Sequence, residues 1–387
     1  MQALDFLSAE HDVTLLTPAP GKGQAGPPAG AAYRVETYRP ARLAALVPGM
    51  ALVLTRNLPL QSGLFYQPDL ARRLRELAPR ADLGILQLVR LAVHLEDFGD
   101  TPILVDLIDS LSLNFSRRAE VDRLWLRPLL RLEARLLAIG ERRLAERAAG
   151  VLLVCERDRQ ALINRLPAEL ARKVSVVRLA VREHEEEPLG AGEQTGPVLA
   201  ITGNLGYFVN ADAVSWWLRE VWPAVRQALP AVRVIIAGDR PAPSLRRAIA
   251  RAGAQLIESP PDMRSIIAQA TFSLAPMRCG SGVPVKVLEA WAAGTPVVAT
   301  PWAAAGTSGR QGEDFRTAGA HPSEWVSAIR ELLDDPAARQ RLAENGRRRL
   351  AADYSPEVVR GQLLDAVRGL GLGSATKRPI SSAPTNG

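Results

Sequence analysis

Residues 274–300 carry the most specific chemistry in the chain, in the sequence LAPMRCGSGVPVKVLEAWAAGTPVVAT. We expect a buried strand here, followed by a loop in which the backbone can approach a ligand closely. The loop contains Gly280, Ser281 and Gly282. Pro284 suits the first turn of the next helix, where the free N–H groups of Val285 and Lys286 would bind phosphate. The stretch therefore predicts an anion site at the end of a strand.

Charged side chains frame the predicted anion site. Arg278 precedes the loop, and Lys286 lies in the first turn of the helix, in a chain whose cations are nearly all arginine. Lys286 and Glu289 are three residues apart, so they share a helix face. A diphosphate needs cations and N–H donors, and a ribose needs an acceptor, which Glu289 would supply. A Lys–Glu pair at this spacing is also common as a solvated ion pair, so both interpretations stay open.

The same stretch resembles the donor-site motif of glycosyltransferase family 4, in particular the sugar transferases of exopolysaccharide systems. That motif is two glutamates separated by seven residues, and the second matches Glu289, which the resemblance implies binds the nucleotide ribose. The first glutamate, which contacts the donor sugar in the family, falls on Ser281 here. The resemblance covers roughly residues 7–370 and implies an α/β fold of the GT-B type, with two Rossmann-like domains facing a cleft.

A second match to the family lies in residues 201–213, at a turn that faces the donor phosphates in the family. The turn contains Gly203, Asn204 and Gly206. The family usually has a basic residue there, whereas this chain has Asn210 near that place, and the resemblance implies that Arg278 compensates. We expect Asn210 to cap the helix that follows. The glycines also fit an ordinary strand-to-helix turn, which remains the alternative.

In the first half of the chain, the segment VDLIDS places Asp106 and Asp109 at the end of a predicted strand. The resemblance implies that residues there face the reacting sugar, so Asp109 would hydrogen-bond a sugar hydroxyl or stabilise an oxocarbenium-like centre. A helix cap or loop aspartate is the alternative interpretation of Asp109. We interpret His94 as a surface or loop residue and not as a catalytic one.

The resemblance implies transfer of a sugar from a nucleotide diphosphate sugar to an acceptor hydroxyl, with retention of configuration, in exopolysaccharide or other surface glycan synthesis. Arg278, Lys286 and the helix N-terminus would stabilise charge on the leaving diphosphate. No Asp-x-Asp motif occurs in the second half, so we expect no metal and no cofactor besides the nucleotide sugar. The expected partners are the nucleotide sugar and a glycan or lipid-linked acceptor. Three alternatives stay open: a sugar-nucleotide epimerase, a truncated non-catalytic protein that binds nucleotide sugar, and a peripheral membrane scaffold.

Strand and helix patterns alternate in both halves, which favours parallel sheets covered by helices. We expect a first domain over residues 1–181, a linker at 182–197, a second domain over 198–370 and a disordered tail at 371–387. Predicted strands of the first domain lie at 13–17, 33–38, 51–55, 83–88, 103–107, 151–155 and 174–179. Those of the second lie at 198–202, 232–237, 255–257, 272–275 and 296–300.

The beginning of the chain departs from a doubly wound domain, which normally opens with a strand, a glycine-rich turn and a helix. Here a helix is predicted over residues 1–9, so we expect that the usual opening strand and turn are missing. Either the start codon is assigned too late or the chain is a truncated form. We predict a flexible glycine- and proline-rich loop at residues 21–30.

Composition narrows the class of protein. Hydrophobic residues make up 47% of the 387 residues and charged residues 23%, which is ordinary for a globular protein. No signal peptide and no membrane-length apolar run is visible, and two distant cysteines fit a reducing compartment, so we expect a cytoplasmic protein. The net charge of +7 predicts attraction to anions or reflects an arginine-biased codon usage. Without zinc-finger or RNA-binding signatures, we do not expect nucleic acid as a partner.

An amphipathic helical pattern begins at Arg117 and ends at Ala148, with a predicted break at Pro128. Its polar face is dense in arginine, and its apolar positions include leucines, namely Leu124, Leu129, Leu132, Leu136 and Leu137. One interpretation is contact with an anionic membrane at the inner face of the cell. The other is a surface helix whose arginines pair with its glutamates, which are Glu120, Glu133, Glu141 and Glu146.

Overall fold

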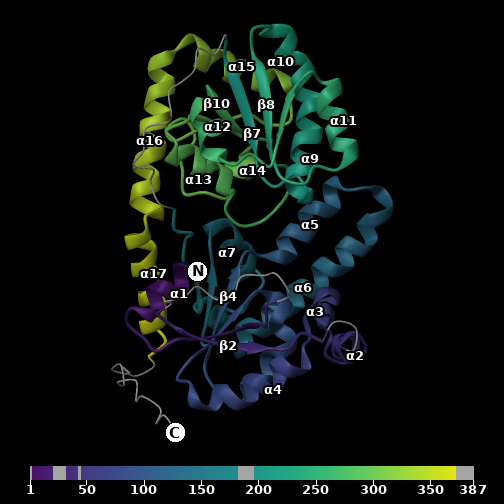
Figure 1. The fold of residues 1–387 in the computed structure, drawn as a ribbon, viewed down its shortest axis with the longest axis vertical. Helices are drawn as coiled ribbons and strands as arrows, with labels where there is room; N and C mark the ends of the chain where they lie inside the picture. Colours follow the sequence, from purple (N-terminus) through teal and green to yellow (C-terminus); the bar gives the residue numbers. More distant parts are fainter. Residues whose placement is uncertain (1, 21–31, 42–44, 182–195, 372–387) are drawn as a thin grey trace, which may run out of the picture.

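The computed structural model describes residues 2–20, 32–41, 45–181 and 196–371. Two α/β halves are stacked along the long axis of the molecule, each with strands inside and helices outside (Figure 1). The loop predicted at 21–30, nearly all of the predicted linker and all but the first residue of the predicted tail lie outside the described residues.

The first half is built on a four-stranded parallel sheet in the order β3-β4-β5-β6. Its strands are β3 (Gly84–Gln87), β4 (Ile103–Ile108), β5 (Gly150–Leu153) and β6 (Val174–Val176). The central strands β4 and β5 are apolar along most of their length, and Leu137 and Leu144 of α6 (Arg127–Arg147) pack on them without exposure. Parallel strands that are buried on both faces are continuous apolar segments in the sequence. For this reason β4 and β5 could be predicted from the sequence.

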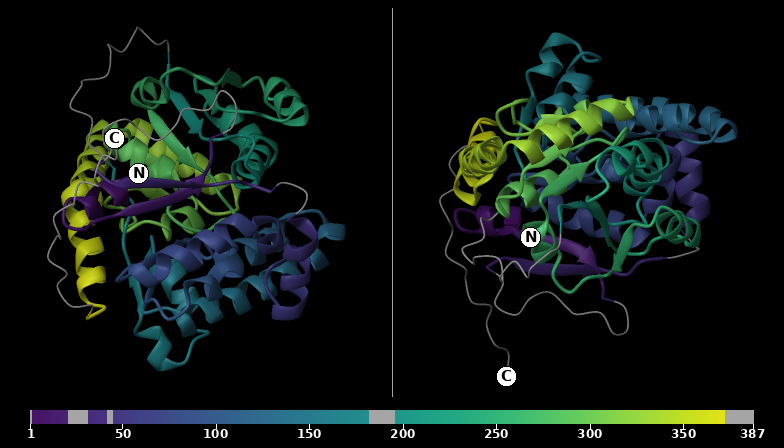
Figure 2. Two further views of the ribbon diagram at one scale, coloured as in Figure 1. Left: turned by 60° about the horizontal axis from the view of Figure 1, so that its bottom comes forward. Right: turned by 90° about the horizontal axis from the view of Figure 1, so that it is seen from above.

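A separate parallel pair, β1 (Thr14–Pro18) and β2 (Arg34–Tyr38), follows the first helix α1 (Gln2–Ser8). Figure 2 shows these two strands side by side, in purple. The helix at the start of the chain and both strands are confirmed.

The strand predicted at residues 51–55 is wrong, because this segment lies in α2 (Leu46–Arg56). Gly49 and Val53 of α2 face Gly63 of α3 (Leu60–Phe65) so closely that a Cβ on Gly49 would lie 2.2 Å from the Gly63 carbonyl oxygen. A short apolar run cannot be assigned to helix or strand from its periodicity alone. The close contact of α2 with Gly63 joins residues that are not adjacent in sequence, so the sequence pattern did not reveal it.

The second half contains a six-stranded parallel sheet in the order β12-β11-β10-β7-β8-β9. Its strands are β7 (Val198–Thr202), β8 (Arg233–Gly238), β9 (Gln255–Glu258), β10 (Phe272–Ala275), β11 (Val297–Ala299) and β12 (Arg316–Thr317). The chain runs outward from β7 in one direction and from β10 in the other, so the order reverses between these two strands. Ligands of open α/β sheets bind in the crevice beyond the carboxyl ends at such a point.

Helices cover both faces of the second sheet (Figure 1). They are α9 (Phe208–Trp216), α10 (Trp222–Ala228), α11 (Pro243–Arg251), α12 (Met263–Gln269), α13 (Val285–Ala292), α14 (Pro301–Ala304) and α15 (Pro322–Asp334). Trp217 lies at the centre of the core, stacked on Trp222 and edge-on to Trp325.

The last helix packs on the first half of the molecule. After α16 (Pro336–Tyr354), helix α17 (Pro356–Arg368) runs down the side of the first domain (Figure 1). Leu363 and Leu364 pack there with Leu104 and Leu152 of the first sheet. From the sequence, this helix was assigned to the second domain, which it follows along the chain. The pattern of a surface helix does not indicate which sheet the helix covers.

The amphipathic region of the first domain forms a helical hairpin. It consists of α5 (Leu111–Val121), a short turn at Leu124–Leu126 and α6. The break therefore comes before Pro128, which lies in the first turn of α6, where its missing N–H costs nothing. None of the helices in the described part of the chain combines the length and the apolar character needed to span a bilayer.

Candidate functional site

The loop between β10 and α13, residues 278–283, is named here the glycine loop. Gly280 and Gly282 have φ values of +107° and +69°, in the region that L side chains rarely adopt. A Cβ on Gly280 would lie 3.1 Å from Val209, and one on Gly282 would lie 3.2 Å from Asp109 of the first domain. The glycines thus serve close packing on both sides, at the crevice between β7 and β10.

Helix α13 begins at Val285, and Pro284 is its N-cap residue instead of lying in its first turn. The first-turn N–H groups of any helix lack an intrahelical acceptor. The N–H groups of Val285 and Lys286 are therefore free to donate toward a ligand, as the sequence predicted. Val285 is half exposed, so this helix start is not sealed by protein.

Lys286 is buried, and its Nζ donates a 2.9 Å hydrogen bond to Asn210 Oδ1. It lies beside the turn after β7, because a Cβ on Gly203 would come within 3.4 Å of the same nitrogen. Among the ion pairs of the described residues, none includes Lys286. Burial lowers the pKa of Lys286 to about 8, although the charge of Glu289 acts in the opposite direction. The site is a buried cation without a bound counter-charge.

Glu289 lies one turn further along α13 and is partly buried. Burial raises the pKa of this carboxyl, while the charges of Lys286 and Arg264 act in the opposite direction. No hydrogen bond to the Glu289 carboxylate occurs among the described residues. Its oxygens are therefore available as acceptors on the same helix face as Lys286.

Arg278 is paired with an acidic residue that the sequence did not indicate. Its guanidinium bonds Asp212 at 2.6 and 3.2 Å and lies 5.4 Å from the ring centre of Trp216. Asp212 is two residues from Asn210 on α9, so the two side chains leave the helix in nearly opposite directions. Arg278 therefore has a carboxylate partner that sequence spacing did not reveal, and its place beside Lys286 in the anion site stays a prediction.

The turn after β7 adopts the expected shape, with Gly203 at φ +135°. Asn204 Oδ1 accepts from Gly206 N at 3.0 Å, and Asn210 Nδ2 donates to Asn204 O at 3.0 Å. Asn210 thus links the turn to Lys286 from within the first turn of α9. It is not the cap of that helix, which begins two residues earlier at Phe208.

Asp109 reaches the glycine loop from the first domain, where its carboxylate accepts a short hydrogen bond from the Ser281 hydroxyl. Burial raises the pKa of Asp109, and the Ser281 bond acts in the opposite direction. The alternative of a helix cap is wrong, because Ser110 caps α5 by accepting from Leu113 N. The structure therefore brings Asp109 and Ser281 together across 172 residues of sequence.

Two other first-domain residues have structural roles. Asp106 accepts bonds from Gln87 Nε2 and from Ile108 N, within the edge of its own sheet. His94 is buried, not at the surface as predicted; its Nε2 accepts from Gln67 N and its Nδ1 contacts Asp97 at 2.9 Å. Within the described residues, no three His, Cys, Asp or Glu side chains gather closely enough to hold a metal ion.

Sequence reasoning missed Arg157 and Asp158, which also contact the glycine loop. They begin α7 (Glu156–Ile163) just after β5, and both contact the main chain of Gly282. The available signal was an acid–base pair at the carboxyl end of a buried strand, where ligand-site residues of parallel sheets gather.

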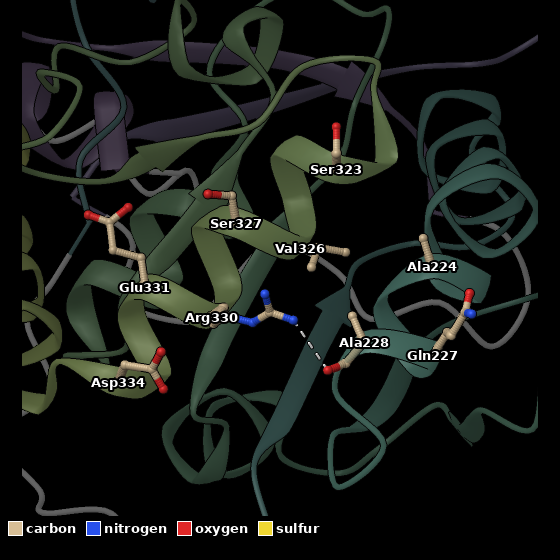
Figure 3. Close-up of a pocket in the computed structure, with 9 residues that line it drawn as sticks. All are labelled: Ala224, Gln227, Ala228, Ser323, Val326, Ser327, Arg330, Glu331 and Asp334. Carbon is tan, nitrogen blue, oxygen red and sulfur yellow. Dashed lines mark hydrogen bonds between the residues drawn. The ribbon is translucent and has the colours of Figure 1, made fainter.

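A cavity of about 610 Å³ lies away from this site, between α10 and α15. Figure 3 shows that Arg330 is held there by the carbonyl of Ala228. The other lining side chains are small or spread along the two helices, so no polar groups converge on one point in the cavity.

Residues 196–335 match the family described as glycosyl transferases group 1. The chain is 26% identical over 257 residues to alpha-D-kanosaminyltransferase of Streptomyces kanamyceticus, covering 60% of this chain and 64% of that protein. It is 32% identical over 170 residues to D-inositol 3-phosphate glycosyltransferase of Corynebacterium urealyticum, covering 39% of each. The matches thus span less than two thirds of the length of these curated relatives.

Solved structures share the fold over nearly the whole chain. Sucrose-phosphate synthase from Thermosynechococcus elongatus has a TM-score of 0.70 at 16% identity, covering 96% of this chain and 92% of that chain. Anabaena HepE in complex with UDP has a TM-score of 0.64 at 15% identity, covering 92% of this chain and all of the other. The chain therefore has the GT-B fold of these structures, and its residues 196–335 match the family of group 1 glycosyl transferases.

Proposed function

We propose that the protein transfers a sugar from a nucleotide diphosphate sugar to an acceptor hydroxyl with retention of configuration, in the synthesis of a surface glycan such as an exopolysaccharide. One observation carries the proposal. Lys286 is buried without an ion-pair partner among the described residues, beside the turn after β7 and at the free start of α13. Such a cation is stabilised by an incoming anion. Anabaena HepE has been solved with UDP and with UDP-glucose, which supports a nucleotide sugar as that anion.

The leaving diphosphate would lie between the turn after β7 and the start of α13. There the Lys286 ammonium and the N–H groups of Val285 and Lys286 stabilise the negative charge that develops as the glycosidic bond breaks. Glu289, with its free carboxylate oxygens, would accept hydrogen bonds from the ribose hydroxyls. Because protein donors supply the counter-charge, the proposal requires no metal and no further cofactor.

The donor sugar would lie toward the first domain, beside Asp109 and Ser281. When ionised, the Asp109 carboxylate would stabilise positive charge at the anomeric carbon or accept a sugar hydroxyl. Ser281 offers a hydroxyl where the related motif has a glutamate, so the sugar contacts here differ from those of that motif. The acceptor, a glycan or a lipid-linked sugar, would approach from the first-domain side of the cleft.

A thermal-shift screen of nucleotides and nucleotide sugars, followed by turnover assays, tests this function. We expect a nucleoside diphosphate to raise the melting temperature by binding the native state. Lys286→Ala should lower transfer by about a hundredfold, as loss of one charge-stabilising donor does. A wild-type protein with no shift at millimolar concentrations of any nucleoside diphosphate would contradict the proposal. Consumption of donor without acceptor would instead favour an epimerase.

The hairpin of α5 and α6 supports a second part of the proposal, contact with the anionic inner face of a membrane by a cytoplasmic protein. Large apolar side chains stand exposed along the tip and the outer face of α6, namely Leu124, Trp125, Leu129, Leu132 and Ile139. Within α6 they are spaced by three residues from Leu129 to Leu132 and by seven, two helical turns, from Leu132 to Ile139, so they form one stripe. Apolar side chains flanked by arginines are the chemistry of helices that lie in the membrane interface.

The charges beside this stripe are largely unmatched. Glu133 turns inward to the backbone of α3, and Glu141 is buried against Ser110 and Ser112. Arg131, Arg135 and Arg143 have no ion pair among the described residues. The interpretation in which the glutamates neutralise the arginines therefore fails for Glu133 and Glu141. It holds for Glu120, which pairs with Arg117, and for Glu146, which pairs with Arg142.

Sedimentation with vesicles tests the membrane contact. We expect binding to phosphatidylglycerol vesicles and little binding to phosphatidylcholine vesicles. The double variant Arg131→Glu and Arg135→Glu should release the protein, since each basic residue contributes about 1 kcal/mol at an anionic surface. The matched control is Arg247→Glu with Arg251→Glu, two exposed arginines at the same spacing on α11 of the second domain. Equal loss of binding in both variants would refute a specific role for α6.

A further inference from the structure

Both main-chain polar groups of Gly282 in the glycine loop are hydrogen-bonded by side chains of the other domain. Gly282 N donates to Asp158 Oδ2 at 2.8 Å, and Gly282 O accepts from Arg157 Nη2 at 2.9 Å. Arg157 and Asp158 are themselves paired at 3.1 Å. Asp158 is fully buried and Arg157 nearly so, which means that both charges are removed from water to contact a backbone across the cleft.

Each of the two residues has a further anchor that links the same elements. Asp158 Oδ2 accepts from Ser110 N at 2.9 Å, next to Asp109 in the loop after β4. Arg157 Nη1 donates to the carbonyl of Trp302 at 2.8 Å, and its guanidinium lies 4.6 Å from the ring centre of that tryptophan. One carboxylate therefore joins the Asp109 loop to the glycine loop, and one guanidinium joins the glycine loop to α14.

We propose that Arg157 and Asp158 are positioning residues, which set the glycine loop in its working geometry when the two domains close. This inference rests on the proposed function, because the loop so positioned carries Ser281 and leads into the anion-binding start of α13. Their hydrogen bonds go to main-chain groups of the loop and of neighbouring segments, so we assign them a role through the loop and not through contact with the donor. They determine where Ser281 lies relative to Asp109, and thus whether the sugar contacts of the two domains meet.

The sequence of the glycine loop explains why side chains from outside the loop are needed to fix its conformation. Glycine at 280 and 282 leaves the backbone free to take many conformations, and Gly282 is held at a φ of +69°. The planar guanidinium of Arg157 donates hydrogen bonds to two carbonyl oxygens in fixed directions. The single ammonium group of a lysine cannot reproduce this geometry. The contacts cross from the first domain to the second, so they require the two domains to be as close as they are here. Displacement of reacting groups by about 1 Å costs about a hundredfold in rate, which sets the scale of the expected effect.

Arg157→Ala tests the inference in the full-length protein with two readouts. Hydrogen exchange of peptides covering residues 278–284 should become about tenfold faster, since a loss of about 1.4 kcal/mol in local stability corresponds to that factor. With the best nucleotide sugar, kcat should fall by about tenfold to a hundredfold. The UDP affinity should stay close to wild type, because the proposed contacts of UDP all lie in the second domain. Arg157→Lys should recover part of the lost kcat.

The matched control is Arg159→Ala, which removes another α7 arginine that donates to a carbonyl, that of Val174, but within the first domain. If Arg157→Ala does not fold, Asp158→Asn replaces it, with the same expectations for the loop. Unchanged hydrogen exchange of the loop in a folded variant would overturn the inference that Arg157 and Asp158 hold the glycine loop. Faster exchange with wild-type turnover would overturn their positioning role. A wild-type protein that transfers sugar from no nucleotide sugar would overturn the proposed function instead. The hydrogen exchange of the loop would then show by itself whether Arg157 and Asp158 hold the glycine loop.

Discussion

The buried amine of Lys286 predicts a specific pH dependence of nucleotide binding. With a pKa of about 8 in the free protein, Lys286 is roughly nine-tenths protonated at pH 7 and roughly one-tenth protonated at pH 9. A diphosphate binds the protonated form, and its charge returns the pKa of the amine toward the ordinary value. The dissociation constant of UDP should therefore rise about tenfold from pH 7 to pH 9. The terminal phosphate itself titrates near about pH 6, so it does not change charge in this window.

Titration calorimetry at pH 7, 8 and 9 measures this dependence, and Lys286→Met is the control. The variant should bind UDP weakly and with an affinity that varies little between these pH values. A wild-type affinity that is constant from pH 7 to pH 9, or a pH dependence that survives in Lys286→Met, would refute the assignment of the phosphate cation to Lys286.

The same pKa makes a linked prediction for stability without ligand. Because burial depresses the pKa from 10.5 to about 8, the unfolded chain binds more protons than the folded chain between these two pH values. The free energy of unfolding of wild type relative to Lys286→Met should therefore rise with pH in this window, by about 3 kcal/mol in total. Urea denaturation at pH 7.5 and pH 10 measures the difference, and its fall with rising pH would contradict a buried unpaired amine.

Three further outcomes are expected. Glu289→Gln should weaken UDP binding by about tenfold, the value of one charged hydrogen bond, with little change for uracil alone, measured by calorimetry. Gly282→Ala should destabilise the protein by about 1–3 kcal/mol in urea denaturation, because of its positive φ and its contact with Asp109. Arg278→Met should leave UDP affinity within about twofold of wild type, since Arg278 is already paired with Asp212; a tenfold loss would support its predicted place in the phosphate site.

The sequence could predict those parts of the site that are contiguous along the chain. Strand β10, the glycine loop and helix α13 follow one another, so their order fixes where the loop glycines and the first-turn N–H groups of Lys286 must lie. The same holds for the turn after β7. Buried parallel strands such as β4 and β7 were also visible, because strands covered on both faces are apolar throughout.

Contacts between distant residues could not be predicted in this way. Arg278 and Asp212 are 66 residues apart, and the spacing of neither residue reveals that they pair. Asp158 and Arg157, which bond the main chain of Gly282, are separated from it by 124 and 125 positions in sequence. Asp109 was placed near the reacting sugar only through a resemblance, and its partner Ser281 became evident once the two domains could be seen together. Spacing gives the local shape of a site, whereas the pairing of its charges depends on which helices the fold places side by side.

The contrast between Lys286, which forms no ion pair among the described residues, and the paired Arg278 bears on why residue 286 is a lysine. If Lys286 binds the diphosphate as we propose, its site is empty during part of the catalytic cycle, and the cation is then buried without a counter-charge. An arginine remains charged at any accessible pH, so it would carry the full cost of burial in the empty state. A lysine can lose its proton at a pH near 8, which limits that cost. Arg278, which holds Asp212 as a permanent partner, is under no such constraint. The proposed function thus gives a physical reason why a chain that uses arginine almost everywhere has lysine at position 286, where the cation would have to be stable both with and without its ligand.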